Sequence, residues 1–124
     1  MKVRTMHEMA LMGDILNIIK EDAEKKEINT IKKIELVVGE LSNAMPDALT
    51  MAFEIYKEQN PLFISQSAKL LIQLEESKAE CVFCNTTYKP DLKISICPNC
   101  NMPSGKLIAG ETFQVISYEG DKNQ

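Results

Sequence analysis

The chain of 124 residues is long enough for one compact domain or two small ones. Hydrophobic residues make up 44% of it and charged residues 26%, which is typical of a folded protein rather than a disordered tail. The 18 acidic residues outnumber the 14 basic ones, and this formal net charge of −4 disfavours binding to nucleic acid. No apolar run exceeds four residues, so we expect a soluble, cytoplasmic protein without a membrane-spanning segment.

Apolar residues recur at three- and four-residue spacing early in the chain, which predicts an amphipathic helix that ends near Lys26. They are Met9, Met12, Ile15, Leu16, Ile19 and Ala23. Thr5 and Glu8 stand in the Thr-x-x-Glu order of a capping box, so the helix is expected to begin at Thr5.

A second helix is expected after Pro46, because proline is favoured at the first helical position. The pair Asn60-Pro61 should end it, since the residue before a proline avoids the helical region. Alternating apolar residues predict three strands. These strands are centred on Ile34, Leu36 and Val38, on Leu70, Ile72 and Leu74, and on Phe113–Tyr118.

This order predicts an α+β fold in which two helices pack on a small three-stranded sheet. The segment 77–108 is short, polar and rich in turns, and it contains all four cysteines. We therefore expect an α+β domain of residues 1–76 and 109–124, interrupted by a zinc-ribbon-like lobe of residues 77–108.

The cysteines form two Cys-x-x-Cys pairs, Cys81 with Cys84 and Cys97 with Cys100, separated by twelve residues. Such pairs let two tight turns direct four thiolates at one ion, and the spacing predicts a structural zinc site with no open position for catalysis. Because the lobe is too small for a core of its own, metal binding should supply its folding energy. Asn85 and Asn101 follow the pairs, and asparagine suits the positive φ of such turns.

Other uses of four cysteines remain open at this point. Two disulfides are disfavoured by a cytosolic setting, and a thioredoxin-like redox site needs only one pair beside a strand and a helix. An iron site with four thiolates is compatible with the spacing. A zinc ribbon that binds nucleic acid is disfavoured, because residues 81–100 hold only Lys89, Lys93 and Asp91 as charged groups.

His7 is the single histidine, and it lies at the expected start of the first helix. The positive end of the helix dipole disfavours the imidazolium, so a neutral imidazole is available as a ligand. Together with backbone nitrogens it would form a nitrogen-rich set that suits Ni²⁺ or Cu²⁺ better than Zn²⁺. The alternative is that His7 is a half-exposed residue without a functional role.

These residues resemble the HypA/HybF family of hydrogenase maturation proteins. The resemblance rests on the stretches Met6–Leu11, Gly39–Ser42, Ala48–Leu49, Ala52–Glu54 and Gly110–Glu111, together with the two cysteine pairs. It extends from Met6 to about Glu119.

The resemblance implies a nickel metallochaperone, not an enzyme, that helps insert Ni²⁺ into the large subunit of [NiFe]-hydrogenase. It implies a HypB-type GTPase as a partner, and in some members a role with urease maturation proteins. Nickel would be held by His7 with backbone nitrogens around it and Glu8 beside it, and structural Zn²⁺ by Cys81, Cys84, Cys97 and Cys100.

The chain departs from the family pattern at its start, because Met1–Thr5 precede the Met-His-Glu motif that normally begins the protein. If these residues are present in the mature chain, no α-amine adjoins His7; synthesis from Met6 would restore one. A zinc-ribbon interaction module without nickel binding is the alternative function.

Overall fold

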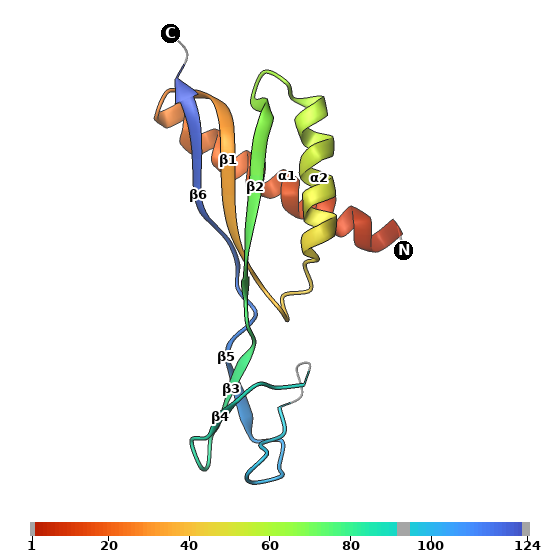
Figure 1. The fold of residues 1–124 in the computed structure, drawn as a ribbon, viewed down its shortest axis with the longest axis vertical. Coiled ribbons are helices and arrows are strands. Elements are labelled where there is room, and N and C mark those ends of the chain that lie inside the picture. The colour runs from red at the N-terminus through yellow and green to blue at the C-terminus, as the bar shows by residue number, and fades with distance from the viewer. Residues whose placement is uncertain (1, 92–94, 123–124) are drawn as a thin grey trace. The chain divides into compact units, whose positions relative to one another are not determined.

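A computed structural model of the chain describes residues 2–91 and 95–122, with side chains from His7 onward (Figure 1). Two helices and six strands follow one another along the described residues. They are α1 (Lys2–Lys25), β1 (Ile28–Gly39), α2 (Pro46–Gln59), β2 (Ile64–Glu75), β3 (Lys78–Cys81), β4 (Thr87–Tyr88), β5 (Gly105–Ala109) and β6 (Phe113–Lys122). Neither helix is long and apolar enough to cross a membrane within the part of the chain described.

The chain divides into two compact units. The first contains both helices and most of β1, β2 and β6, whereas the second consists of Val37–Asn43 and Leu74–Phe113 and contains β3, β4 and β5. Each unit has its own three-stranded sheet, in the order β2-β1-β6 in the first and β4-β3-β5 in the second.

Contacts at the strand ends define the directions in the first sheet. The N–H of Ile31 donates to Phe63 just before β2, and the N–H of Glu40 donates to Glu75 at its end. β1 and β2 are therefore parallel, with α2 as the crossover between them. Lys32 near the start of β1 pairs with Asp121 near the end of β6, so β6 is antiparallel to β1, as its arrow in Figure 1 shows.

The core of the first unit lies between the helices and one face of this sheet. It is formed by the apolar stripe that was predicted on α1, by the alternating apolar residues that were predicted on β1, and by apolar residues of α2 and β2. The buried residues are Met12, Ile15, Leu16, Ile19, Ala23, Ile34, Leu36, Leu49, Ala52, Phe53, Ile64 and Ala68, and Val38 of the same parity is buried where β1 enters the second unit. The predicted α+β architecture of two helices and a small three-stranded sheet is thus confirmed.

The predicted start of the first helix is wrong. α1 begins at Lys2 rather than at Thr5, so Glu8 lies beyond the first helical turn and not at the third position of a capping box. Its carboxylate instead accepts a hydrogen bond from the backbone N–H of Met45, which precedes α2. Glu8, which the local pattern assigned to a helix cap, therefore makes a long-range contact instead. By contrast, α2 begins at Pro46 and stops before Asn60, as predicted.

The second unit is an antiparallel ribbon in which β3 lies between β4 and β5. β3 pairs Glu80 with Thr87 of β4 and Cys81 with Gly105 of β5. Asn85 and Asn101 have φ values of 62° and 57°, which confirms the left-handed turn predicted after each cysteine pair.

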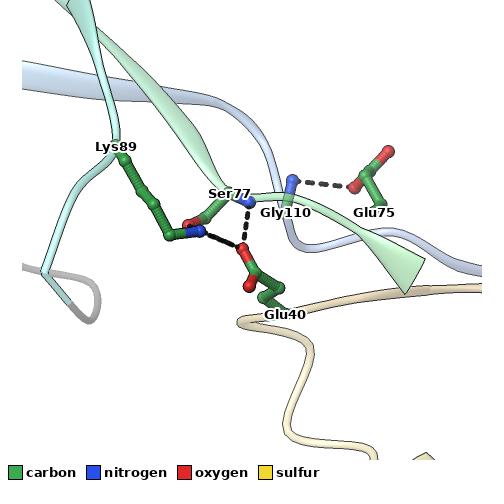
Figure 2. Close-up of polar contacts among 5 residues, drawn as sticks. All are labelled: Glu40, Glu75, Ser77, Lys89 and Gly110. Atoms are coloured by element: carbon green, nitrogen blue, oxygen red, sulfur yellow. Dashed lines mark hydrogen bonds and ion pairs between the residues drawn. The ribbon is translucent and has the colours of Figure 1, made fainter.

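Gly39, Gly110 and Glu75 hold the ends of this ribbon together. Gly110 has a φ of 114°, and a Cβ on Gly39 would collide with the Gly110 backbone, so neither position accepts a side chain without strain. Oε1 of Glu75 accepts the N–H of Gly110 at 2.7 Å (Figure 2). Thr112 also donates to this carboxylate, through both its N–H and its hydroxyl.

Candidate metal centre

The four cysteines come together in the second unit. Cys81 ends β3 and Cys84 lies in the turn after it, while Cys97 and Cys100 lie in the turn that precedes β5. Cys81 and Cys97 are buried, Cys84 and Cys100 are half-buried, and all four are free thiols. Within residues 2–91 and 95–122, this is the one group of three or more metal-ligating side chains close enough to hold an ion.

The spacing of the sulfurs suits a tetrahedral ion. All four Sγ atoms lie within 4.8 Å of one another, with 3.8 Å between Cys81 and Cys100 and 3.7 Å between Cys84 and Cys97. Four sulfurs at a Zn–S distance of about 2.3 Å form a tetrahedron with edges of about 3.8 Å. A disulfide needs sulfurs only about 2.0 Å apart, so the arrangement is that of a metal cluster.

Neighbouring backbone and hydroxyl groups lower the pKa of both thiols in the first cysteine pair. The N–H groups of Phe83 and Cys84 point at the Cys81 sulfur, and the Ser104 hydroxyl lies 3.1 Å from it. The Thr86 hydroxyl, 3.1 Å from the Cys84 sulfur, is the main cause that lowers the pKa of Cys84 to about 5. The first pair is therefore prepared to bind a cation.

In the second cysteine pair, the pKa of Cys100 shifts in the opposite direction. The N–H of Cys100 donates to the Cys97 sulfur at 3.4 Å. The sulfurs of Cys84 and Cys81 raise the pKa of Cys100 to about 12. Because a bound ion needs four thiolates, metal binding has to displace a proton from Cys100.

Glu40 anchors the segment that connects the two cysteine pairs. Its Oε1 accepts the Ser77 N–H at 2.6 Å and lies 2.5 Å from Nζ of Lys89, a residue between Cys84 and Cys97 (Figure 2). Lys89 is the largest cause that lowers the pKa of Glu40 to about 2, and the Ser77 N–H is the next. The sequence shows Glu40 in the block Gly39–Ser42, but the role of its side chain is visible only in the structure.

His7 and Glu8 lie on α1 in the first unit, in contrasting environments. The His7 side chain is exposed, whereas the Glu8 side chain is 0% exposed. Oε2 of Glu8 accepts the Met45 N–H at 2.8 Å, and Oε1 is buried with no hydrogen-bond partner among the residues that the structure describes. The structure thus fixes Glu8 inside the unit and leaves the imidazole of His7 accessible to a ligand.

The fold and the cysteine cluster together define a small metal-binding α+β protein, and comparison with known proteins gives the family. A family model described as "Hydrogenase/urease nickel incorporation, metallochaperone, hypA" matches residues 6–120. The chain belongs to this HypA family of nickel-incorporation metallochaperones.

Curated relatives agree with this assignment. A hydrogenase maturation factor HypA from Moorella thermoacetica is 34% identical over 116 residues, which cover 94% of this chain and 100% of the relative. The HypA from Aquifex aeolicus is 26% identical and covers 92% of this chain and 96% of its own length.

Two solved structures share the fold. A solution structure of a HypA protein has a TM-score of 0.65 at 25% identity and covers 93% of this chain and 96% of its own. The Ni metallochaperone HypA from Helicobacter pylori has a TM-score of 0.62 at 22% identity, with 94% and 98% covered.

Proposed function

We propose that this protein binds Ni²⁺ near the start of α1 and delivers it to the large subunit of [NiFe]-hydrogenase, without catalysing a reaction. One observation carries the proposal: the family match begins at Met6, directly before an exposed imidazole, that of His7. Its neighbour Glu8 is anchored to Met45, so the helix is held in place while His7 faces outward. A site with one side-chain ligand at a helix start can release its ion readily.

The helix itself limits which nitrogens can join His7. In an α-helix that begins at Lys2, the amides of His7 and Glu8 donate to the carbonyls of Val3 and Arg4. A helix that begins near Met6 leaves its first amides without such partners and places the terminal amine beside His7. A chain that starts at Met6 would therefore offer nickel the His7 imidazole together with the amine and the amide nitrogens around it.

Nickel titration calorimetry on the two chains and their variants tests this site. The chain beginning at Met6 should bind nickel more tightly than the chain beginning at Met1, and His7→Ala should abolish binding in both. Asn17→Ala, an exposed change further along α1, is the matched control and should bind like its parent. Nickel binding that survives His7→Ala would refute the site, and equal affinities of the two chains would refute the terminal amine as a ligand.

For the cysteine cluster we propose structural Zn²⁺. The tetrahedral sulfur spacing supports a closed four-thiolate site, and such a site lacks the open position that a catalytic zinc requires. Elemental analysis should find one zinc per chain. A coloured protein with iron in place of zinc would contradict this assignment.

The proposed partners are a HypB-type GTPase, the hydrogenase large subunit and, as in some members of the family, urease maturation proteins. What supports them is membership of a hydrogenase/urease nickel-incorporation family. Co-elution of the purified chain with a HypB-type GTPase tests the first, with Asn17→Ala as the unaffected control; failure of the two to associate would contradict it.

One observation favours the alternative, a zinc-ribbon interaction module without nickel binding. In the chain from Met1, α1 runs through the residues whose amides the nickel site needs. Absence of nickel binding in both the Met1 and the Met6 chains would select this alternative.

A further inference from the structure

The hairpin of β3 and β4, which carries the first cysteine pair, has a very short ladder. β4 is the outer strand of its sheet and is two residues long, pairing Tyr88 with Ala79 and Thr87 with Glu80. Pro90 follows shortly after β4 and has no N–H with which the ladder could continue. A two-stranded pairing of this length is marginally stable in water, so further contacts must hold β4 against β3.

The Glu40 carboxylate makes such a contact at the point where this ladder ends. Its Oε1 accepts the Ser77 N–H at 2.6 Å and the Ser77 hydroxyl at 3.2 Å, and it lies 2.5 Å from Nζ of Lys89 (Figure 2). Nζ of Lys89 is also 3.4 Å from the Ser77 hydroxyl oxygen. Ser77 directly precedes β3 and Lys89 directly follows β4, so one carboxylate joins both strands at the open end of the hairpin.

The other end of the same hairpin holds two of the four sulfurs. Cys81 is the last residue of β3, and Cys84 lies in the turn that leads to β4. The N–H of Cys81 donates to the Thr86 carbonyl at 2.9 Å, which closes the turn end. The hairpin is therefore tied at both ends, by a backbone hydrogen bond beside the sulfurs and by Glu40 away from them.

Burial decides how much the Glu40 contact can contribute. The side chains of Glu40 and Lys89 are 38% and 61% exposed, and an ion pair that is this accessible to water contributes little by itself. Ser77, however, is buried, and its N–H gives the carboxylate a fixed, charge-assisted partner. The combination of a fixed backbone donor and a mobile ammonium predicts an effect of several-fold on an equilibrium, not of many orders of magnitude.

We propose that Glu40 is a positioning residue for the metal cluster. By closing the β3–β4 hairpin through Ser77 and Lys89, it holds the turn with Cys81 and Cys84 in place around the ion and slows the release of the ion. This inference rests on the structural zinc site proposed above. Because metal binding and folding of this lobe are coupled, a contact made in the folded lobe and absent from the unfolded chain raises the affinity for the metal.

The experiment measures zinc affinity and zinc release on the purified full chain, loaded with one zinc per chain. Competition with a chelating dye gives the dissociation constant, and transfer of zinc to excess dye gives the release rate. Glu40→Gln keeps an acceptor for the Ser77 N–H but loses the ion pair, and it should weaken zinc binding about fivefold. Lys89→Met should have a similar effect. The double variant should bind about as well as either single variant, because all three lose the same contact.

A charge-matched control and a local readout test the cause. Lys78→Met removes an exposed ammonium from β3, at a position whose neighbour on β5 is Ala109, and should keep the affinity of the parent. Amide hydrogen exchange on the zinc-loaded chains shows where the lobe loosens. In Glu40→Gln, exchange should become faster in β4 and stay unchanged in β5, whereas a general loss of stability of the lobe would raise exchange in both strands.

The outcomes separate this inference from the proposed metal site. If Glu40→Gln binds and releases zinc like the parent, the inference is overturned and the zinc assignment stays intact. An equal loss of affinity in Lys78→Met, or exchange that rises equally in β4 and β5, would also overturn it. A parent chain purified without zinc would contradict the metal assignment itself, and the inference would fall with it.

Discussion

The carboxylate of Glu8 on α1 accepts a hydrogen bond from the backbone N–H of Met45, with 2.8 Å between Oε2 and the nitrogen. Met45 is the N-cap residue of α2, so the negative charge lies at the positive end of that helix dipole. The contact ties the beginning of α1 to the beginning of α2, and it does so one residue after the proposed nickel ligand His7. Of these two neighbours on α1, Glu8 therefore connects the helices, while His7 is the proposed nickel ligand.

Replacing Glu8 by alanine should lower the free energy of unfolding by about 2 kcal/mol, because a hydrogen bond and buried methylene groups are lost. Urea unfolding followed by the helical circular dichroism signal measures this, since both helices belong to the first unit. His7→Ala is the matched control and should change stability by no more than about 0.5 kcal/mol, because the side chain is exposed. A larger loss of unfolding free energy in His7→Ala than in Glu8→Ala would contradict the structural role of Glu8.

The ion pair between Glu40 and Lys89 should make the second unit sensitive to acid. The pKa of Glu40 is about 2 in the folded state and 4.5 for the unperturbed group, so its ionised form stabilises the fold above pH 4.5. This contribution should disappear as the pH falls from 4.5 toward 2. Glu40→Gln should therefore be less stable than the parent at pH 6, and the difference should shrink at pH 3.

Urea unfolding at several pH values measures this difference. Only pH values at which both proteins retain one zinc per chain are compared, because loss of metal would unfold the second unit in both. A stability difference that stays constant between pH 6 and pH 3 would exclude Glu40 as the source.

Removal of the metal should unfold the second unit and leave the helices in place, because β3, β4 and β5 surround the cluster whereas the apolar core lies in the first unit. Amide hydrogen exchange after chelation should show loss of protection in β3 and retained protection in α2. Cys97→Ser should likewise reduce the zinc content measured by elemental analysis. Ile96→Ser, a change at an exposed neighbour, should keep the full metal content.

Asn101 should tolerate glycine but not a β-branched residue. Its φ of 57° lies in the left-handed region, which costs a residue with a Cβ about 1–2 kcal/mol. Asn101→Val should therefore lower the thermal unfolding temperature of the zinc form, whereas Asn101→Gly should leave it near that of the parent. Equal temperatures for the two variants would show that the turn does not require this conformation.

Local patterns in the sequence were sufficient for much of this architecture. Each of these patterns describes one element by itself. They are the apolar stripe from Met12 to Ala23 on α1, the alternation of Ile34, Leu36 and Val38 on β1, and the proline that begins α2. The cysteine spacing likewise predicted a four-cysteine cluster, because a Cys-x-x-Cys turn directs its own two sulfurs.

Patterns of this local kind misplaced the start of α1. The Thr-x-x-Glu order favoured a capping box, but the Glu8 carboxylate binds Met45, which is 37 residues away. No spacing in the sequence indicates a partner at such a distance.

What the sequence by itself determined is the two helices and the three long strands, the two cysteine pairs and the family to which the motifs belong; the three short strands β3, β4 and β5 appear only in the structure. Tertiary structure alone decided which polar groups meet. It placed the Lys89 ammonium on the Glu40 carboxylate and the Glu8 carboxylate on the Met45 N–H. The physical reason is that apolar periodicity and turn chemistry act within a few residues, whereas hydrogen bonds and ion pairs depend on which distant segments folding brings together.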